Sequence, residues 1–489
     1  MGVAFLGEPL AHALVEFDEQ GAWAPNYEEQ GTVLGMDGGL LGIDITDARI
    51  IDGKAIAVDR QLEIEYRVSR FPADHPNTVR LTLTGEHGAR LVLVAVSTGG
   101  GMFEIRMVNG ETVRIGGDMH EWLGALASSP TDQQRAALDG ALSGTPAFVE
   151  AATNRLLHIR SSDPFSPEIL ALLDALDWVD SAMTSPPVMP IISGREGTFP
   201  FTTFPEMVAY AEREGGSFGE LGLKYEAARS GLDEATLLGK MNELVTLIEG
   251  SIAGGLAGTE YADRILHQQS HKIAEAEATG QLPTTGLVNR IIENVTAIME
   301  SKSAMEIIVA APTAGGCGTL GGTIKAVADA KGISNEAKVR AYFAAGLVGV
   351  FFARGPGFSA ETGGCQLETG AAASMAAAAL VDLCGGTAMQ SAAAASMALQ
   401  NTIGLVCDPV ADRVEVPCLG KNVTAGVNAL AASTMALSGF NAVIPLDEVI
   451  ETVSSVAASM PRSLCCTGLG GLAATPTAAT LKASLSCAC

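Results

Sequence analysis

The sequence has few basic residues, few aromatic residues and no long uninterrupted apolar run. Its 489 residues include 30 Lys and Arg against 55 Asp and Glu, so the formal net charge is −25. A chain this acidic repels the phosphate backbone, and we expect no nucleic-acid partner. Aromatic residues make up only 5% of the chain, whereas glycine contributes 56 residues. This composition indicates close contacts between elements that carry small side chains.

The apolar stretches are too short for a membrane span. The Ala-rich region at residues 370–399 is interrupted by Asp382 and by Gly385-Gly386, so neither half reaches the roughly 20 residues that a bilayer requires. The stretch from Met1 to Leu10 contains no Lys or Arg, which a signal peptide needs. We therefore expect no membrane association and a cytoplasmic location.

The nine cysteines include no Cys-x-x-Cys pair, so zinc-ribbon and ferredoxin spacings are absent. An odd number of cysteines without a secretory signal favours thiols or metal ligands over disulfides. Three cysteines lie close to Gly or Pro, where a loop can present a thiolate: Cys365 in GGCQ, Cys407 in VCDPV and Cys418 in VPCLG. Residue types alone leave two interpretations open, a three-cysteine metal site and three small core residues.

Residues 1–183 have the pattern of an α+β domain. Between residues 60 and 115, apolar and polar side chains alternate in short runs, which predicts antiparallel strands. Asn109-Gly110 lies between two such runs and predicts a two-residue hairpin. A strand at residues 155–159 and a helix at residues 166–176 complete the domain.

Residues 202–489 have helical periodicity and predict an all-α domain. Residues 184–201 contain four prolines and are predicted to link the two domains, because such a run cannot continue a helix. We thus predict a multi-domain fold, with an α+β domain followed by an all-α catalytic domain. Ala-rich helices are expected at the centre of the second domain, because they present almost no charge. The expected helices are 233–253, 334–345, a helix after Pro445, and the Ala-rich segments 370–381 and 392–399.

The segment AAPTAGGCG, residues 310–318, has a Pro-Thr turn followed by glycines, and a helix is expected to begin near Thr323. Glycines before a helix expose N–H groups that suit a phosphate or a carboxylate. The same residues fit a tight turn between core helices, and both interpretations stay open. No Gly-Lys-Ser/Thr follows, so a Walker nucleotide site is not predicted.

Read with their neighbours, the three cysteines resemble those of the iron–sulfur-dependent L-serine dehydratases, also called L-serine ammonia-lyases. STGGGMFEIRMVNG and the HPN at residues 75–77 are similar to the smaller β domain of that family. The resemblance implies a two-domain enzyme. The stretches that carry it are AAPTAGGCG, ETGGCQLETGAAASMAAAAL (361–380), NTIGLVCDPVADRVEVPCLGKN (401–422) and CTGLGGLAATPTA (466–478).

In that family three cysteines hold a [4Fe–4S] cluster, and the resemblance maps them onto Cys365, Cys407 and Cys418. The fourth iron is left for substrate and acts as a Lewis acid on the hydroxyl group of L-serine. β-Elimination and deamination then give pyruvate and ammonia. Some relatives end in a cysteine that caps this iron, which makes Cys489 the candidate removable ligand and Cys487 its alternative. A tail without function is the competing interpretation.

The resemblance also implies polar groups around the substrate. The turn at Thr313 would hold the substrate carboxylate, and Lys421 and Asn422 would supply donors near the cluster. These three residues are the predicted catalytic positions. The expected partners are a small-molecule amino acid and further copies of the chain in a homo-oligomer.

The sequence departs from the family pattern in two places. The Pro-Ser-Ser-Ser-His-Thr stretch that supplies an active-site histidine is absent, and His12 lies in a different context. The resemblance begins only at about Tyr27 to Asp44, as if a first segment were missing. Gly420-Lys421-Asn422 stands where many relatives have Glu-Arg-Asn. The identity of the general base therefore stays open. Two alternative functions also stay open: a lyase that acts on cysteine or threonine, and a non-catalytic iron–sulfur or thiol redox sensor.

Overall fold

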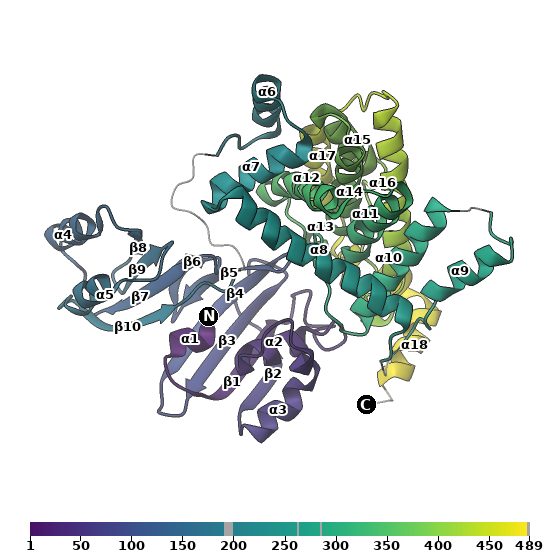
Figure 1. Ribbon diagram of the computed structural model, residues 1–489. Helices are drawn as coiled ribbons and strands as arrows, with labels where there is room; N and C mark the ends of the chain where they lie inside the picture. The colour runs from purple at the N-terminus through teal and green to yellow at the C-terminus, as the bar shows by residue number, and fades with distance from the viewer. Residues whose placement is uncertain (190–198, 262–263, 284–285, 487–489) are drawn as a thin grey trace.

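The computed structural model describes residues 1–189, 199–261, 264–283 and 286–486. The strands occupy the N-terminal part, and the chain from residue 204 onward forms helices (Figure 1). This arrangement confirms the predicted fold class. Most of the predicted linker, residues 190–198, lies outside the described residues. Within the described ranges, every helix is either too short or too polar to cross a lipid bilayer.

The larger sheet has the strand order β2-β1-β3-β4-β5-β6 and is mixed rather than purely antiparallel, because β1 and β2 run parallel. The connection between these two strands holds two short helices, α2 and α3, as a parallel pair requires. Val108 pairs with Glu111, which confirms the hairpin at Asn109-Gly110. The elements are α1 (Gly2–Leu6), β1 (Leu10–Asp18), α2 (Thr32–Leu41), α3 (Gly53–Asp59), β2 (Glu63–Ser69), β3 (Thr78–Gly85), β4 (Arg90–Gly99), β5 (Met102–Val108) and β6 (Glu111–Ile115).

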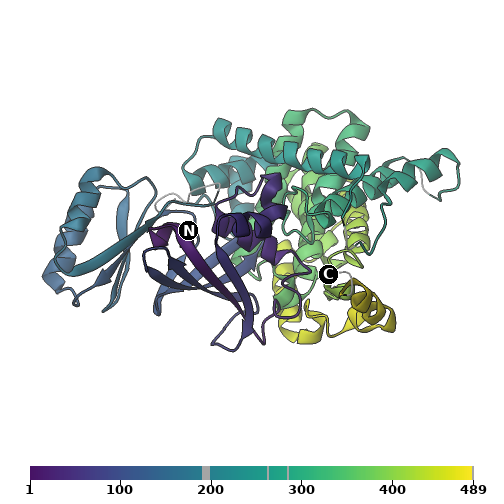
Figure 2. The same cartoon turned by 90° about the horizontal axis from the view of Figure 1, so that it is seen from below.

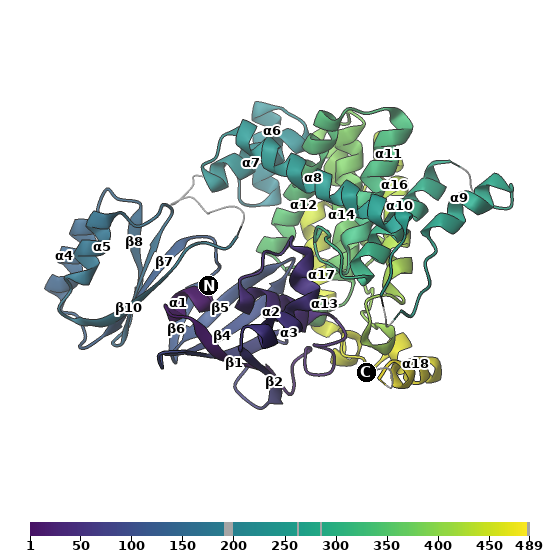
Figure 3. The same cartoon turned by 60° about the horizontal axis from the view of Figure 1, so that its bottom comes forward.

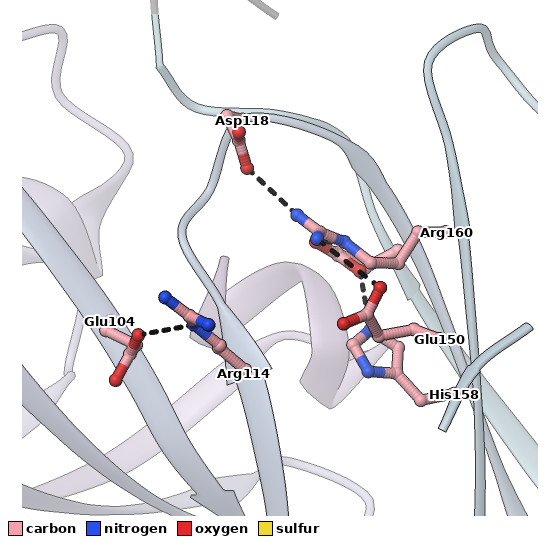
Figure 4. A network of polar contacts seen from close by, with 7 residues as sticks. Glu104, Arg114, Asp118, Glu150, His158 and Arg160 are labelled. Atoms are coloured by element: carbon pink, nitrogen blue, oxygen red, sulfur yellow. Dashed lines mark hydrogen bonds and ion pairs between the residues drawn. The ribbon is translucent and has the colours of Figure 1, made fainter. Parts of the chain in front are cut away.

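The smaller sheet has the order β10-β7-β9-β8, and its elements follow the β-α-β-β-α-β sequence of ferredoxin-like units. A polar network crosses it (Figure 4). His158 Nε2 lies 2.7 Å from Glu121 Oε2 with both side chains fully buried, and Arg160 bonds Asp118 at 3.0 Å. The elements are β7 (His120–Leu126), α4 (Asp132–Leu142), β8 (Ala147–Ala152), β9 (Leu156–Ser161), α5 (Pro167–Asp174) and β10 (Val179–Ser185).

The helical part is built around α14, an Ala-rich helix that lies inside the bundle (Figures 1 and 3). It contacts α11, α12, α15 and α16, as expected for a slim apolar helix. The helices are α6 (Phe204–Glu214), α7 (Phe218–Ser230), α8 (Glu234–Ala257), α9 (Ser270–Ala278), α10 (Leu287–Ser303), α11 (Cys317–Lys331), α12 (Asn335–Arg354), α13 (Ala360–Gly363), α14 (Ala371–Leu383), α15 (Ala388–Gln400), α16 (Cys418–Leu437), α17 (Leu446–Ser459) and α18 (Pro476–Ser486).

Helix α11 corrects one expectation. It begins at Cys317 rather than near Thr323, so several of the glycines lie inside the helix and not before it. The reason is the packing of neighbouring helices: a Cβ at Gly322 would stand 2.6 Å from Val295 N, and one at Gly321 would stand 2.4 Å from Ile248 Cγ2. These glycines let α11 approach α10 and α8 closely, which outweighs their low helix propensity.

The larger sheet meets the helical part through the turn between β4 and β5. Figure 2 shows the larger sheet and the helical part from below. A Cβ at Gly100 would stand 2.7 Å from Pro312 O, and one at Gly99 would stand 3.1 Å from Ser359 N. Both glycines have a positive φ, 65° and 89° respectively. Only glycine combines this backbone conformation with so close an approach. The turn thus brings the sheet against the loops where the thiols lie.

Candidate functional site

Three separate segments supply the three predicted thiols. Cys365 follows α13 at a sharp bend, where Gly364 has φ 76° and a Cβ would stand 2.7 Å from Leu405 O. Cys407 lies in the loop after α15, and Cys418 is the first residue of α16. All three are buried.

The structure brings these thiols together. The Cys407 thiol lies within hydrogen-bonding reach of Cys365, and the Cys365 and Cys418 thiols are close enough to influence each other electrostatically. Cys365, Glu368 and Cys407 present ligand atoms within 4.8 Å of one another. Cluster ligands bind different iron atoms, so their sulfur atoms need not meet at a single point.

A cavity of about 230 Å³ lies beside the thiols. Cys407 and Cys418 are in its wall, together with a further cysteine, Cys466. Cys466 also contacts the Cys407 thiol, so a fourth sulfur atom joins the predicted three. The spacing of the cysteines in the sequence does not indicate that Cys466 lies near Cys407. A backbone contact between two distant loops brings these two residues together.

The titratable groups of the described cavity wall are Lys302, Glu361 and Glu368, together with the cysteines, and no histidine is among these described residues. Burial raises the pKa of Glu368 to about 7, and the negative charge of Glu361 adds to the effect. Burial lowers the pKa of Lys302, whose Nζ donates to Val414 O at 2.8 Å. The wall thus holds groups suited to accept or donate a proton, none of which the sequence singled out.

Lys421 lies beside Cys365 and is not among the described residues of the cavity wall. Its ammonium group donates to Val406 O and to Asp408 Oδ1, both at 2.7 Å, and lies 3.9 Å from Cys365 Sγ. Asp408 in turn accepts from Leu472 N at 2.9 Å. Lys421 therefore places a positive charge beside a thiol, and Asp408 connects its own loop to the segment at Leu472.

Asn422 and Thr313 act on the turn before α11. Asn422 Nδ2 donates to Gly315 O at 2.7 Å and to Cys418 O at 2.9 Å, and its Oδ1 accepts from Thr319 N at 3.1 Å. The amide is thus occupied and fixes the turn rather than facing the cavity. Thr313 does line the cavity, and its Oγ1 accepts from Gly316 N at 3.1 Å.

The larger sheet covers the other side of the cavity. Trp23, Gln30 and Asn77 line it, together with Ser97 and Gly99 at the end of β4 and with Gly100 and Gly101 of the turn that follows. Asn77 Nδ2 donates to Ser359 Oγ at 3.4 Å across the boundary. His12 lies on β1, paired with Glu63 and Thr84, and is not in the described wall.

A family model described as the serine dehydratase alpha chain matches residues 180–473. This span is more than half of the chain, and it contains the thiols at 365, 407, 418 and 466. The chain belongs to the serine dehydratase alpha-chain family. The resemblance found in the sequence is thereby confirmed.

Individual members of the serine dehydratase family are similar to this chain over part of its length. The chain is 45% identical over 191 residues to a probable L-serine dehydratase alpha chain of Latilactobacillus sakei, covering 39% of this chain and 91% of the relative. It is 38% identical over 243 residues to the probable alpha chain of Bacillus subtilis, covering 50% and 81%. It is 31% identical over 282 residues to L-serine dehydratase 1 of Escherichia coli, covering 56% and 62%.

The donor set in this serine dehydratase family member suits an iron–sulfur cluster. Thiolates are the ligands that such clusters use, and separate loops here present three of them at one place. Burial raises the pKa of the Cys418 thiol, so bound iron would be needed to favour the thiolate. The Lys421 ammonium group beside Cys365 would offset part of the negative charge. Cys487 and Cys489, the predicted tail ligands, lie outside the described residues.

Proposed function

We propose that the chain catalyses β-elimination and deamination of L-serine to pyruvate and ammonia. The observation that carries this proposal is the convergence of Cys365, Cys407 and Cys418 beside a small cavity, in a member of the serine dehydratase family. The names of the aligned relatives support L-serine as the substrate. A cavity of about 230 Å³ is of a size for a small amino acid rather than a nucleotide.

The three thiolates would hold a [4Fe–4S] cluster. When bound, the cluster supplies an open iron that acts as a Lewis acid and makes the serine hydroxyl a better leaving group. Cys365, Cys407 and Cys418 would fix its position, and Lys421 would stabilise their charge. Asn422 would hold the turn before α11 in place against Cys418.

The protein's own groups would handle the carboxylate and the α-proton. Thr313 and the adjacent turn would bind the substrate carboxylate, because they line the cavity. Glu368 would take the α-proton, since it lines the cavity within hydrogen-bonding reach of Thr313 and 3.9 Å from Cys365 Sγ. Loss of that proton and of the hydroxyl as water gives aminoacrylate, and its imine tautomer takes up water to release ammonia and pyruvate.

We also propose that residues 1–183 close over a site carried by residues 202–489, with residues 184–201 joining the two domains. The described cysteines are all free thiols, which fits a reducing, cytoplasmic location. A homo-oligomer remains our expectation for the assembly.

Anaerobic purification tests this function. We expect brown protein that contains iron and sulfide and releases pyruvate from L-serine faster than it releases the corresponding keto acid from L-threonine or pyruvate from L-cysteine. A higher rate with one of those two amino acids would reassign the substrate. Colourless protein that binds zinc would contradict the cluster.

A non-catalytic iron–sulfur redox sensor is the second candidate. The described cavity wall favours it in one respect, because a fourth thiol stands where substrate would approach the cluster. Brown protein that turns over none of the three amino acids, but changes its visible spectrum reversibly with oxidants, would support the sensor.

A further inference from the structure

Cys466 is held beside Cys407 by the backbone. Cys407 N donates to Leu464 O at 2.8 Å, and Cys466 N donates to Cys407 O at 2.9 Å. These two bonds align the segment at residues 464–466 with the loop of Cys407, in a short parallel bridge between Cys407 and Cys465. The position of Cys466 relative to a predicted cluster ligand is therefore fixed before any side chain is considered.

The two adjacent cysteines of this segment point to different places. Cys465 Sγ donates to Pro461 O at 3.7 Å, within its own segment. Cys466 has φ 60°, an unusual conformation for a residue other than glycine, and its thiol faces the cavity and the Cys407 thiol. The strained backbone thus accompanies a thiol that is turned toward the site.

The surroundings of Cys466 are those of a site rather than of an apolar core. It lines the same cavity as Glu361 and Glu368. Gln30 Nε2 donates to its Sγ at 3.6 Å, and Asn26 Nδ2 donates to its carbonyl oxygen at 3.2 Å. Both amides come from the N-terminal part of the chain, so the covering side of the cavity contacts this thiol directly.

A cluster of four irons has four ligand positions, and three thiols account for only three of them. We propose that Cys466 is the fourth ligand of the resting cluster, occupying the iron that substrate later binds. This inference rests on the proposed function, because it presumes the cluster. It identifies the ligand that caps the fourth iron before substrate binds as Cys466, a residue of the folded site, rather than Cys487 or Cys489 of the tail.

The segment around Cys466 allows the cap to be displaced. Apart from the two backbone bonds to the Cys407 loop it contains only short 3₁₀ turns, at Arg462–Leu464 and Gly471–Ala474, so a shift of Cys466 breaks at most those two bonds and no long helix or strand. Gln30 Nε2 already donates to Cys466 Sγ at 3.6 Å and is placed to donate to the released sulfur. Substrate binding would then exchange a sulfur ligand for substrate oxygen, and the thiolate would take up a proton as it leaves.

The test compares full-length anaerobic proteins that differ in one thiol: wild type, Cys466→Ala, Cys465→Ala as the matched neighbour, and Cys487→Ser/Cys489→Ser for the tail. Iron and sulfide content are measured first, and then the rate at which ferricyanide removes one iron to leave a paramagnetic three-iron cluster, followed by electron paramagnetic resonance. We expect Cys466→Ala to lose that iron at least about tenfold faster than wild type. Cys465→Ala and the tail variant should match wild type.

A second measurement covers the case in which Cys466→Ala folds poorly. Mössbauer spectra of ⁵⁷Fe-loaded wild type and Cys466→Ser should differ at one iron of the four, and L-serine should produce a comparable change in wild type. Equal iron loss and equal spectra in wild type and Cys466 variants would overturn this inference while leaving the proposed function intact. Faster loss in the tail variant alone would assign the cap to the tail. Wild type without iron and sulfide would overturn both.

Discussion

The two sides of the cavity differ in what they contribute. The helical side supplies every cysteine and every charged group of the described wall, including Lys302, Glu361 and Glu368. The sheet side supplies an indole ring, amides, a serine and the glycine backbone at residues 99–101. The family match likewise covers the helical side and not the larger sheet.

This difference indicates that the helical side carries the reactive groups and that the sheet side closes the cavity. The helical side holds the groups that can bind metal or move protons, and its position depends on tight packing between helices. The sheet side approaches through backbone and uncharged groups, so it can exclude water and orient substrate without adding charge. Changes on the helical side should therefore abolish binding of the cluster or the chemical step, whereas changes on the sheet side should alter substrate binding and leave the iron content unchanged.

The largest expected effect follows from Cys407→Ala. Because Cys407 is central among the converging thiols, its loss should reduce anaerobic iron content by more than about 100-fold and activity to background. Iron analysis and visible absorption measure this directly. Cys384→Ala, at a half-buried thiol outside the described wall, is the control. Full iron content in the Cys407 variant would contradict the role of the helical side as the metal site.

Glu368→Gln should separate proton transfer from metal binding. We expect kcat to fall by about 10²- to 10⁴-fold, the usual size of a general-base effect, with iron content unchanged. Glu361→Gln is the comparison, because the Glu361 carboxylate lines the same cavity but is held by the Ser359 hydroxyl at 2.7 Å. If Glu361→Gln lowers kcat more than Glu368→Gln, the base is assigned to the wrong carboxylate.

On the sheet side, Gly100→Ala tests closure. The new Cβ would stand 2.7 Å from Pro312 O and push the turn away from the helical side. Misplacing a substrate-positioning group by about 1 Å can lower the reaction rate by as much as about 100-fold. We therefore expect kcat/KM to fall by about 10- to 100-fold without loss of iron. Gly101→Ala is a matched control, because its φ of 77° imposes the same backbone strain while no atom lies within 4 Å. Equal losses in both variants would attribute the effect to strain alone.

The smallest effect concerns stability of the helical side. A Cβ at Gly255 in α8 would stand 2.1 Å from Ala297 O in α10, so Gly255→Ala should lower the free energy of unfolding by about 1–3 kcal/mol. Gly250→Ala, in the same helix with no atom within 4 Å, should raise it by about 0.5–1 kcal/mol. Denaturant unfolding of both variants measures the difference. Stabilisation by both substitutions would show that α8 and α10 are not closely packed.

Local signals in the sequence predicted much of the fold. The hairpin at Asn109-Gly110, the cap of α8 at Asp233 and the buried Ala-rich helices each depend on neighbouring residues, and all three appear as expected. The parallel pairing of β1 with β2 was not predicted, because each residue pairs with one 51 positions away in the sequence. The early start of α11 was missed for a similar reason: its glycines are favoured by contacts with other helices, not by local propensity.

The candidate site shows the same limit. The residues next to Cys365, Cys407 and Cys418 carried the family resemblance, so these thiols could be named from the sequence. Cys466 lies in a matching stretch, but its contact with Cys407 depends on a bridge between Cys407 and Cys465, which are 58 residues apart. Asn422 was expected to supply a donor near the cluster, and the structure shows its amide bonded to three backbone groups. Which polar atoms remain available depends on packing that one sequence does not reveal.

The central claim is that three thiols hold one iron–sulfur cluster beside the substrate cavity. Diffraction from anaerobic crystals, recorded at the iron absorption edge, tests it most directly. We expect anomalous density from four irons within bonding distance of the sulfur atoms of Cys365, Cys407 and Cys418, with one iron facing the cavity. Anomalous density elsewhere, or none at these thiols in protein that turns over L-serine, would contradict the account.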